Sequence, residues 1–105
     1  MKVLYVASEA LPFMASGGLG DVAGSLPVAL RKRLIGCRVV MPLYDGIKQE
    51  FKDQMKFITS ISVPVSWRRQ YCGIFEAKAN GVIYYFLDNQ YYFCLLYTSD
   101  AADDL

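Results

Sequence analysis

A glycine-rich segment between an apolar run and an amphipathic run constrains this fold more than any other feature. Residues 3–7 are typical of a buried strand, and residues 22–34 of a helix. Between them lie Gly17 and Gly18. Glycine tolerates positive φ and close approach of a ligand, and the first N–H groups of a helix suit an anion such as phosphate. The pattern therefore favours either an anion site or a simple turn of the chain.

Two more apolar runs predict further core strands, over residues 38–43 and 82–87. Strand, helix and strand with short connections form a right-handed βαβ unit. We therefore expect residues 3–7, 38–41 and 82–87 to be parallel strands in the middle of one sheet, within a three-layer α/β fold. A ligand site is expected at the carboxyl ends of these strands.

The helix between the first two strands is expected to have one apolar face and a glycine C-cap. Its large apolar residues recur at helical spacing, and Gly36 stands where a C-cap is typical. The residues of the expected face are Val22, Leu26, Ala29, Leu30 and Leu34.

A β-hairpin is predicted between the second and third core strands, after a short helix at residues 47–52. Residues 57–67 alternate as in an exposed strand, and residues 71–79 form its partner through a connection at residues 68–70. Asn80-Gly81 is the strongest turn signal in the chain.

The missing residue types exclude several kinds of chemistry. The chain has no histidine, which excludes Ser-His-Asp and Cys-His nucleophile systems and most zinc sites. Cys37, Cys72 and Cys94 are odd in number and lack metal-ligand spacing, so buried or idle thiols are favoured over catalytic or disulfide roles.

Charge and hydropathy bear on partners and location. A net charge of +1 gives no argument for nucleic acid or a membrane surface as a partner. No apolar run approaches the roughly 18–20 residues that span a bilayer, and the first residues do not fit a signal peptide. We expect a cytoplasmic protein.

Several segments, in order, are similar to the N-terminus of bacterial glycogen synthases and plant starch synthases, the retaining glucosyltransferases of glycosyltransferase family 5. One departure is Ala15, where the family usually has a lysine facing the nucleotide sugar. The similar segments are residues 1–9, Pro12-Phe13, residues 17–22, Ser25-Leu26-Pro27, residues 39–44 and residues 84–89.

The resemblance implies the N-terminal part of a Rossmann-like domain of a GT-B glycosyltransferase, with a parallel sheet core plus a β-hairpin. Such a hexosyltransferase moves glucose from ADP-glucose to the non-reducing end of an α-1,4-glucan such as glycogen. The resemblance implies that it uses no metal. No cofactor is implied either, since ADP-glucose is itself a substrate. The implied substrate-binding residues are Gly17, Gly18 and Asp21, and no catalytic residue is assigned. Asp21 could equally complement the helix dipole.

Three aromatic residues have two interpretations each under this resemblance. Tyr91 and Tyr92 could stack on sugar or adenine or pack in the core, and for Trp67 packing is favoured over glucan binding.

The resemblance runs over residues 1–93, a partial catalytic domain. Residues 94–105 are similar to the in-frame translation of a sequencing-library adapter, so we exclude them from fold reasoning. The chain alone is then expected to be inactive. Two alternatives are a truncated product without function and a dinucleotide-binding module, in which Gly18, Gly20 and Gly24 form the fingerprint and Asp45 binds ribose.

Overall fold

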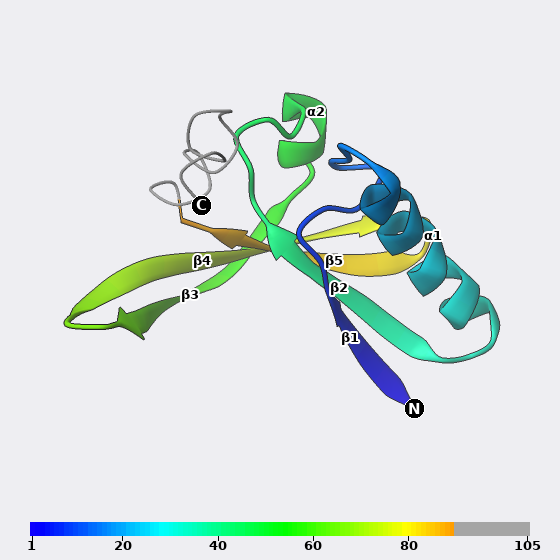
Figure 1. Ribbon diagram of the computed structural model, residues 1–105, viewed down its shortest axis with the longest axis horizontal. Helices are drawn as coiled ribbons and strands as arrows, with labels where there is room; N and C mark the ends of the chain where they lie inside the picture. Colours follow the sequence, from blue (N-terminus) through cyan, green and yellow to red (C-terminus); the bar gives the residue numbers. More distant parts are fainter. Residues whose placement is uncertain (90–105) are drawn as a thin grey trace.

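The structure is a computed structural model that describes residues 1–89, and these form one mixed sheet with a long helix beside it (Figure 1). The predictions for residues 90–105, including Tyr91, Tyr92 and Cys94, lie outside the described residues. The elements in chain order are β1 (Lys2–Val6), α1 (Gly18–Lys32), β2 (Gly36–Pro42), α2 (Gln49–Lys52), β3 (Lys56–Val65), β4 (Arg68–Ala79) and β5 (Val82–Asp88).

The five strands lie in the order β1-β2-β5-β4-β3. β1 pairs parallel with β2, and β2 pairs parallel with β5. β4 and β3 then add two antiparallel strands beyond β5. The predicted parallel core and hairpin are therefore both confirmed. β1, which the sequence placed in the middle of a sheet, lies at the edge of the sheet formed by residues 1–89.

The turn of the β3–β4 hairpin lies at Ser66-Trp67, so the predicted connection at residues 68–70 is wrong. Val65 pairs directly with Arg68, and Ser66 takes the left-handed conformation with φ 58°. This segment has no glycine, asparagine or aspartate to mark a turn. Trp67 is 88% exposed, so the packing favoured for it does not occur among the described residues.

The turn between β4 and β5 is the one that Asn80-Gly81 predicts. Asn80 has φ 52° and Gly81 has φ 79°, and Ala79 pairs with Val82 across them. Positive φ at both central residues is the geometry of a type I′ hairpin turn.

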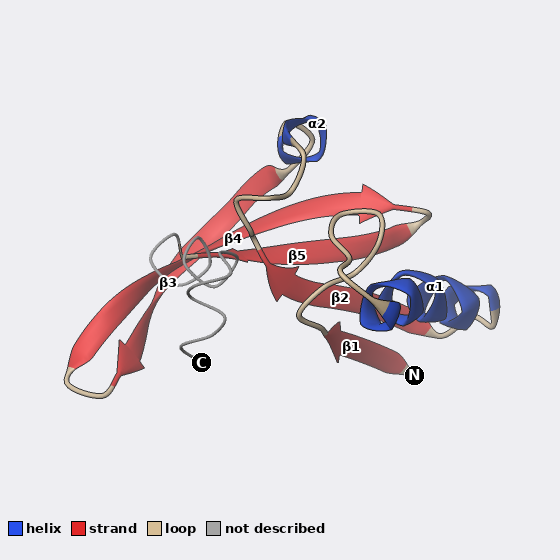
Figure 2. Cartoon of the chain, turned by 45° about the horizontal axis from the view of Figure 1, so that its top comes forward, coloured by secondary structure: helices blue, strands red, loops and turns tan. Residues whose placement is uncertain are grey.

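The described residues place a helix on one face of the parallel strands. α1 contacts β2 and β5, and Figure 2 shows it alongside them. Val6 of β1 points away from this side and is 75% exposed. Parallel strands are normally covered on both faces, so two of the three expected layers are present in residues 1–89. Within that range no helix is long and apolar enough to cross a membrane.

The buried face of α1 differs from the prediction. Its buried residues are Gly20, Ala23 and Pro27, whereas Val22 is 52% exposed and Leu26 is also exposed. The prediction followed the large apolar residues. Small residues instead allow the preceding loop to lie directly on the helix, as the contacts of Gly20 and Gly24 described below show.

α1 ends in a Schellman motif with Leu34, not Gly36, in the left-handed position. Leu34 has φ 63°, its N–H donates to the carbonyl of Arg31 at 2.9 Å, and the N–H of Ile35 donates to that of Leu30 at 3.0 Å. Glycine normally occupies this position because a Cβ is unfavourable there. Leu34 is 94% exposed.

Leu34→Gly is therefore expected to stabilise the chain. The substitution relieves the left-handed strain and removes almost no buried surface, while glycine loses more backbone entropy on folding. The net gain in the free energy of unfolding should be about 0.5–1 kcal/mol, measured by urea unfolding. Leu34→Ala keeps the Cβ and serves as the control. A loss of stability in Leu34→Gly would contradict the assigned helix end.

Candidate functional site

The predicted site residues gather at the start of α1. Residues 8–17 connect the carboxyl end of β1 to this helix, and we call them the glycine-rich loop because they lead into the glycines of the helix start, from Gly17 onward. Gly17 is the N-cap, Gly18 is the first helical residue, and Asp21 lies in the first turn. All three are exposed. The carboxyl ends of β1, β2 and β5 lie at the same edge of the sheet, because these strands are parallel.

Gly17 and Gly18 have ordinary backbone geometry, and the space that a side chain would occupy at either residue is open. Gly17 has φ −172° and Gly18 does not have positive φ, so the expectation that these glycines supply positive φ is wrong. A Cβ added to either residue would meet nothing within 4 Å. The described chain gives no internal reason for glycine here, and the space is open to a ligand.

Gly20 and Gly24 have the opposite surroundings. A Cβ on Gly20 would overlap the Cβ of Ala15 and lie 3.0 Å from its Cα, and one on Gly24 would lie 2.8 Å from the carbonyl oxygen of Leu11. These glycines face the glycine-rich loop, and the dinucleotide fingerprint that uses them is not favoured. Nothing in the sequence pattern assigned this role to Gly20 and Gly24, although their spacing of four residues places them on one helix face.

Aromatic packing anchors the middle of the glycine-rich loop. Phe13 is buried, and its ring lies edge-on to those of Phe51, Tyr84 and Phe86, at centroid distances of 5.2, 4.9 and 4.8 Å. Such pairs add about 0.5–1.5 kcal/mol beyond burial. Packing of the Phe13 side chain thus fixes the position of the loop against the sheet and α2.

Polar contacts hold the same part of the loop. The Leu11 N–H donates to the Gly20 carbonyl at 3.1 Å. The Tyr84 hydroxyl donates a long hydrogen bond of 3.5 Å to the Leu11 carbonyl. Burial, with a smaller contribution from Cys37, raises the pKa of Tyr84, so this hydroxyl keeps its proton at neutral pH.

Glu9 holds the end of the glycine-rich loop. Its Oε2 accepts from the Ser16 backbone N–H at 2.6 Å and from the Ser16 Oγ at 3.0 Å. Ser16 directly precedes Gly17, so this contact fixes the chain at the entry to α1. Glu9 was part of the recognised opening motif, but its sequence position suggested no role.

The cysteines of the described chain fit the prediction of idle thiols. Cys37 and Cys72 are free, and burial raises the pKa of both thiols. A raised thiol pKa lowers the fraction of reactive thiolate at neutral pH.

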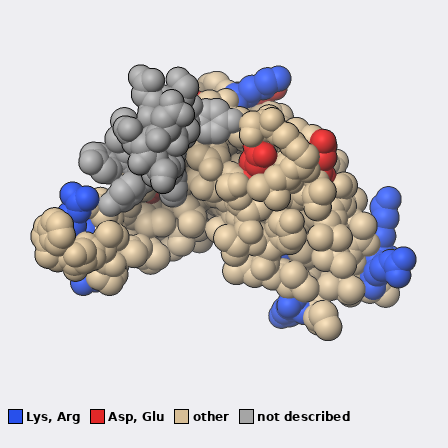
Figure 3. All heavy atoms as spheres, in the orientation of Figure 1, with Lys and Arg blue, Asp and Glu red and all other residues tan. Residues whose placement is uncertain are grey.

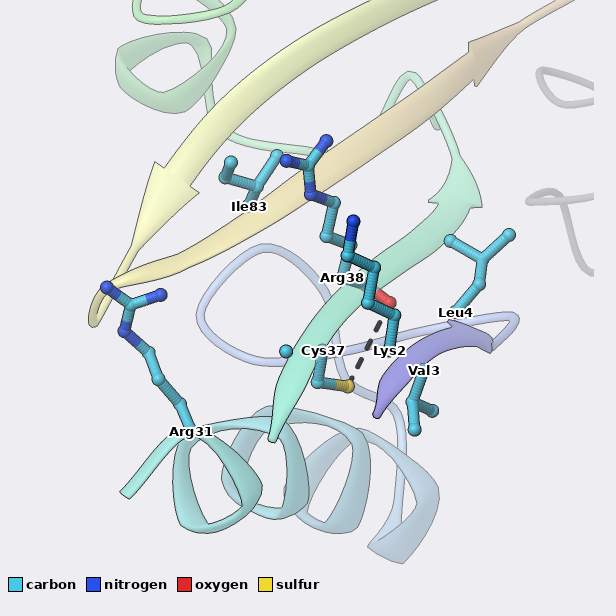
Figure 4. Close-up of a pocket in the computed structure, with 8 residues that line it drawn as sticks. Lys2, Val3, Leu4, Arg31, Cys37, Arg38 and Ile83 are labelled. Atoms are coloured by element: carbon cyan, nitrogen blue, oxygen red, sulfur yellow. Dashed lines mark hydrogen bonds between the residues drawn. The ribbon is translucent and has the colours of Figure 1, made fainter. Parts of the chain in front are cut away.

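A separate cavity of about 510 Å³ lies at the amino ends of β1 and β2, and neither Gly17 nor Gly18 lines it (Figure 4). Its cations are Lys2, Arg31 and Arg38, but Arg31 extends away from the other two in Figure 4. Arg38 donates to the Tyr85 hydroxyl and lies over its ring. The three cations do not converge on one point.

Charged side chains on the face shown in Figure 3 do not form a basic patch. The lysines and arginines lie apart around its periphery. Residues 1–89 contain no group of three or more His, Cys, Asp or Glu that could hold a metal ion.

Comparison with known proteins finds glycogen and starch synthases among the relatives of this chain. The family model described as the starch synthase catalytic domain matches residues 2–105. The glycogen synthase of Geobacillus stearothermophilus is 56% identical over 93 residues, which are 89% of this chain and 19% of that protein. The glycogen synthase of Clostridium botulinum strain Eklund 17B is also 56% identical over 93 residues, 89% of this chain and 20% of that protein.

A solved structure has the same fold. It is the catalytic domain of Starch Synthase IV from Arabidopsis thaliana bound to ADP and acarbose, with a TM-score of 0.78 and 23% identity over 88% of this chain and 20% of that one. The present chain spans about a fifth of the length of these relatives. With the parallel core, the hairpin and the family match over residues 2–105, the chain belongs to the starch synthase catalytic domain family.

Proposed function

We propose that this chain is the donor-binding start of a glycogen synthase, which transfers glucose from ADP-glucose to the non-reducing end of an α-1,4-glucan with retention. The observation that carries the proposal is the exposed N-terminus of α1, where Gly17 and Gly18 leave open space. Relatives more than half identical to the chain are glycogen synthases, and the solved starch synthase holds ADP and acarbose.

The first turn of α1 would bind the leaving diphosphate. Backbone N–H groups at a helix N-terminus donate to anions, and the helix dipole adds favourable potential. Charge develops on the leaving phosphate during glucosyl transfer, so preorganised donors stabilise the transition state more than the substrate. The loop contacts of Phe13, Tyr84 and Glu9 hold these donors in place before the donor sugar binds.

Asp21 would act on a neutral group of the donor. Its carboxylate lies in the same turn as the proposed phosphate donors and would repel a diphosphate. A sugar hydroxyl donating to Asp21 avoids this repulsion. The alternative is that Asp21 only complements the helix dipole.

Transfer of radiolabelled glucose to glycogen tests the proposed function. Residues 1–93 would replace the corresponding segment of the Geobacillus stearothermophilus glycogen synthase, giving what we call the joined enzyme. We expect it to transfer glucose from ADP-glucose to glycogen, and the 105-residue chain alone to transfer none. The unmodified Geobacillus enzyme controls for the assay. An inactive joined enzyme that is folded and stable would contradict the proposal.

Ala15→Lys in the joined enzyme tests the departure from the family. Ala15 is exposed, so a lysine fits without repacking. A working enzyme without this lysine must stabilise the diphosphate through other groups, so we expect little change in the KM for ADP-glucose. Ala15→Met is the uncharged control, and steady-state kinetics is the measurement. If the diphosphate lacked a cation, lysine would lower this KM about tenfold or more, as a charged hydrogen bond of about 1.5–3 kcal/mol predicts.

A further inference from the structure

Glu9 connects the sheet to the first turn of α1. The N–H of Ala7 donates to the Val40 carbonyl at 3.0 Å, which fixes the chain to β2 two residues before Glu9. Seven residues later, Ser16 donates both its backbone N–H and its hydroxyl to the Glu9 carboxylate, at 2.6 and 3.0 Å. One half-buried side chain therefore closes the glycine-rich loop at the residue before the N-cap.

The other anchors of this loop act further along the chain from Gly17 and Gly18. Phe13 packs in the aromatic cluster, and the backbone of Leu11 bonds to Gly20. The contact through Ser16 acts next to Gly17, which has no side chain to cap the helix. A hydrogen bond to a carboxylate is shorter and about twice as strong as one between neutral groups. Of the contacts that hold this loop, the one between Glu9 and Ser16 therefore restricts the direction of the N–H groups of Gly17 and Gly18 most directly.

We infer that Glu9 is a positioning residue for the nucleotide sugar: through Ser16 it fixes the orientation of the N–H groups of Gly17 and Gly18. The inference rests on the proposed function. Glu9 would not touch the donor. Because Ser16 supplies two donors to its carboxylate, part of the negative charge is compensated beside the proposed anion site.

The test compares Glu9→Ala, Glu9→Gln and Ser16→Ala in the joined enzyme. Glu9→Ala removes both contacts, and we expect the KM for ADP-glucose to rise about tenfold, as the loss of a charged hydrogen bond predicts. Glu9→Gln keeps a neutral acceptor and should recover much of the loss. Ser16→Ala keeps the backbone contact and should have the smallest effect. The KM for glycogen should not change in any of the three.

Two further measurements separate positioning from direct contact and from unfolding. Hydrogen–deuterium exchange of the peptide covering residues 8–17 should be faster in Glu9→Ala, while the thermal midpoint stays close to that of the parent. Adding Ser16→Ala to Glu9→Ala should raise the KM no further, because the shared contact is already lost.

Each outcome supports or overturns the inference. An active Glu9→Ala enzyme with an unchanged KM for ADP-glucose overturns it and leaves the proposed function intact. An equal rise in both KM values with a lower thermal midpoint also overturns it, since Glu9 would then be only structural. A further rise in KM on adding Ser16→Ala would mean that Ser16 acts on the donor independently of Glu9, and it would also overturn the inference. A parent joined enzyme that neither binds nor uses ADP-glucose overturns the proposed function, and this inference with it.

Discussion

Gly20→Ala is expected to destabilise the chain by about 2 kcal/mol, within the range typical of overpacking. The added Cβ would overlap the Cβ of Ala15 and lie 3.0 Å from its Cα. Backbone atoms cannot rotate away as a flexible side chain can, so the glycine-rich loop would have to move off the helix. This cost outweighs the gain of about 1 kcal/mol that alanine brings to a helix interior. Urea unfolding measures the difference.

Gly18→Ala is the matched control in the same helix. A Cβ at Gly18 meets nothing within 4 Å, so its stability should equal or exceed that of the parent chain. Ala15→Gly combined with Gly20→Ala should recover only part of the loss, because it removes the overlapping Cβ but leaves the Cα of residue 15 at 3.0 Å. Equal stability of Gly20→Ala and Gly18→Ala would show that the loop does not pack on α1 as described.

Gly18→Val in the joined enzyme is expected to lower kcat/KM for ADP-glucose about a hundredfold or more, comparable with the loss of one good oxyanion donor, about 3 kcal/mol. The open space before Gly18 is where we place the diphosphate. A branched side chain there would keep phosphate away from the N–H groups of the first turn. Since Gly18 does not have positive φ, the loss would come from blocked approach and not from backbone strain.

Stability measurements separate this effect from misfolding. Valine has a helix propensity no worse than glycine, and the space before Gly18 is open. We therefore expect the thermal midpoint of Gly18→Val to match the parent. Gly18→Ala, with a smaller side chain, should lose less activity. Full activity in a folded Gly18→Val enzyme would show that the diphosphate does not bind at Gly18.

The sequence predicts the core of the sheet well and its connections less well. Residues 3–7, 38–41 and 82–87 form apolar runs long enough to identify strands, and Asn80-Gly81 marks its turn through positive φ. Ser66 also has positive φ, but the turn at Ser66-Trp67 carries no glycine, asparagine or aspartate that would mark it in the sequence.

The helix face was mispredicted because small residues give a weak apolar signal. Gly20, Ala23 and Pro27 are buried, while larger side chains such as Val22 and Leu26 are exposed. Which side of the helix is covered depends on the glycine-rich loop, and its path is set by tertiary contacts of Phe13. Hydrophobic periodicity does not record such contacts.

The location of the candidate site can be predicted from the sequence, but the contacts that hold its loop in place cannot. Strand, glycine-rich segment and helix predict that Gly17 and Gly18 stand at a helix N-terminus. The contact between Glu9 and Ser16 joins residues seven apart in an irregular loop, where no periodic rule relates them. The binding roles of Gly17, Gly18 and Asp21 remain predictions.

A crystal structure of the joined enzyme with ADP tests the central claim most directly. We predict that oxygens of the diphosphate lie within hydrogen-bond distance, about 2.7–3.2 Å, of backbone N–H groups in the segment formed by Gly17, Gly18 and Leu19. In the same structure, the Glu9 carboxylate should still accept from Ser16. An ADP molecule whose phosphates bind elsewhere, with the N-terminus of α1 left to solvent, would contradict the account.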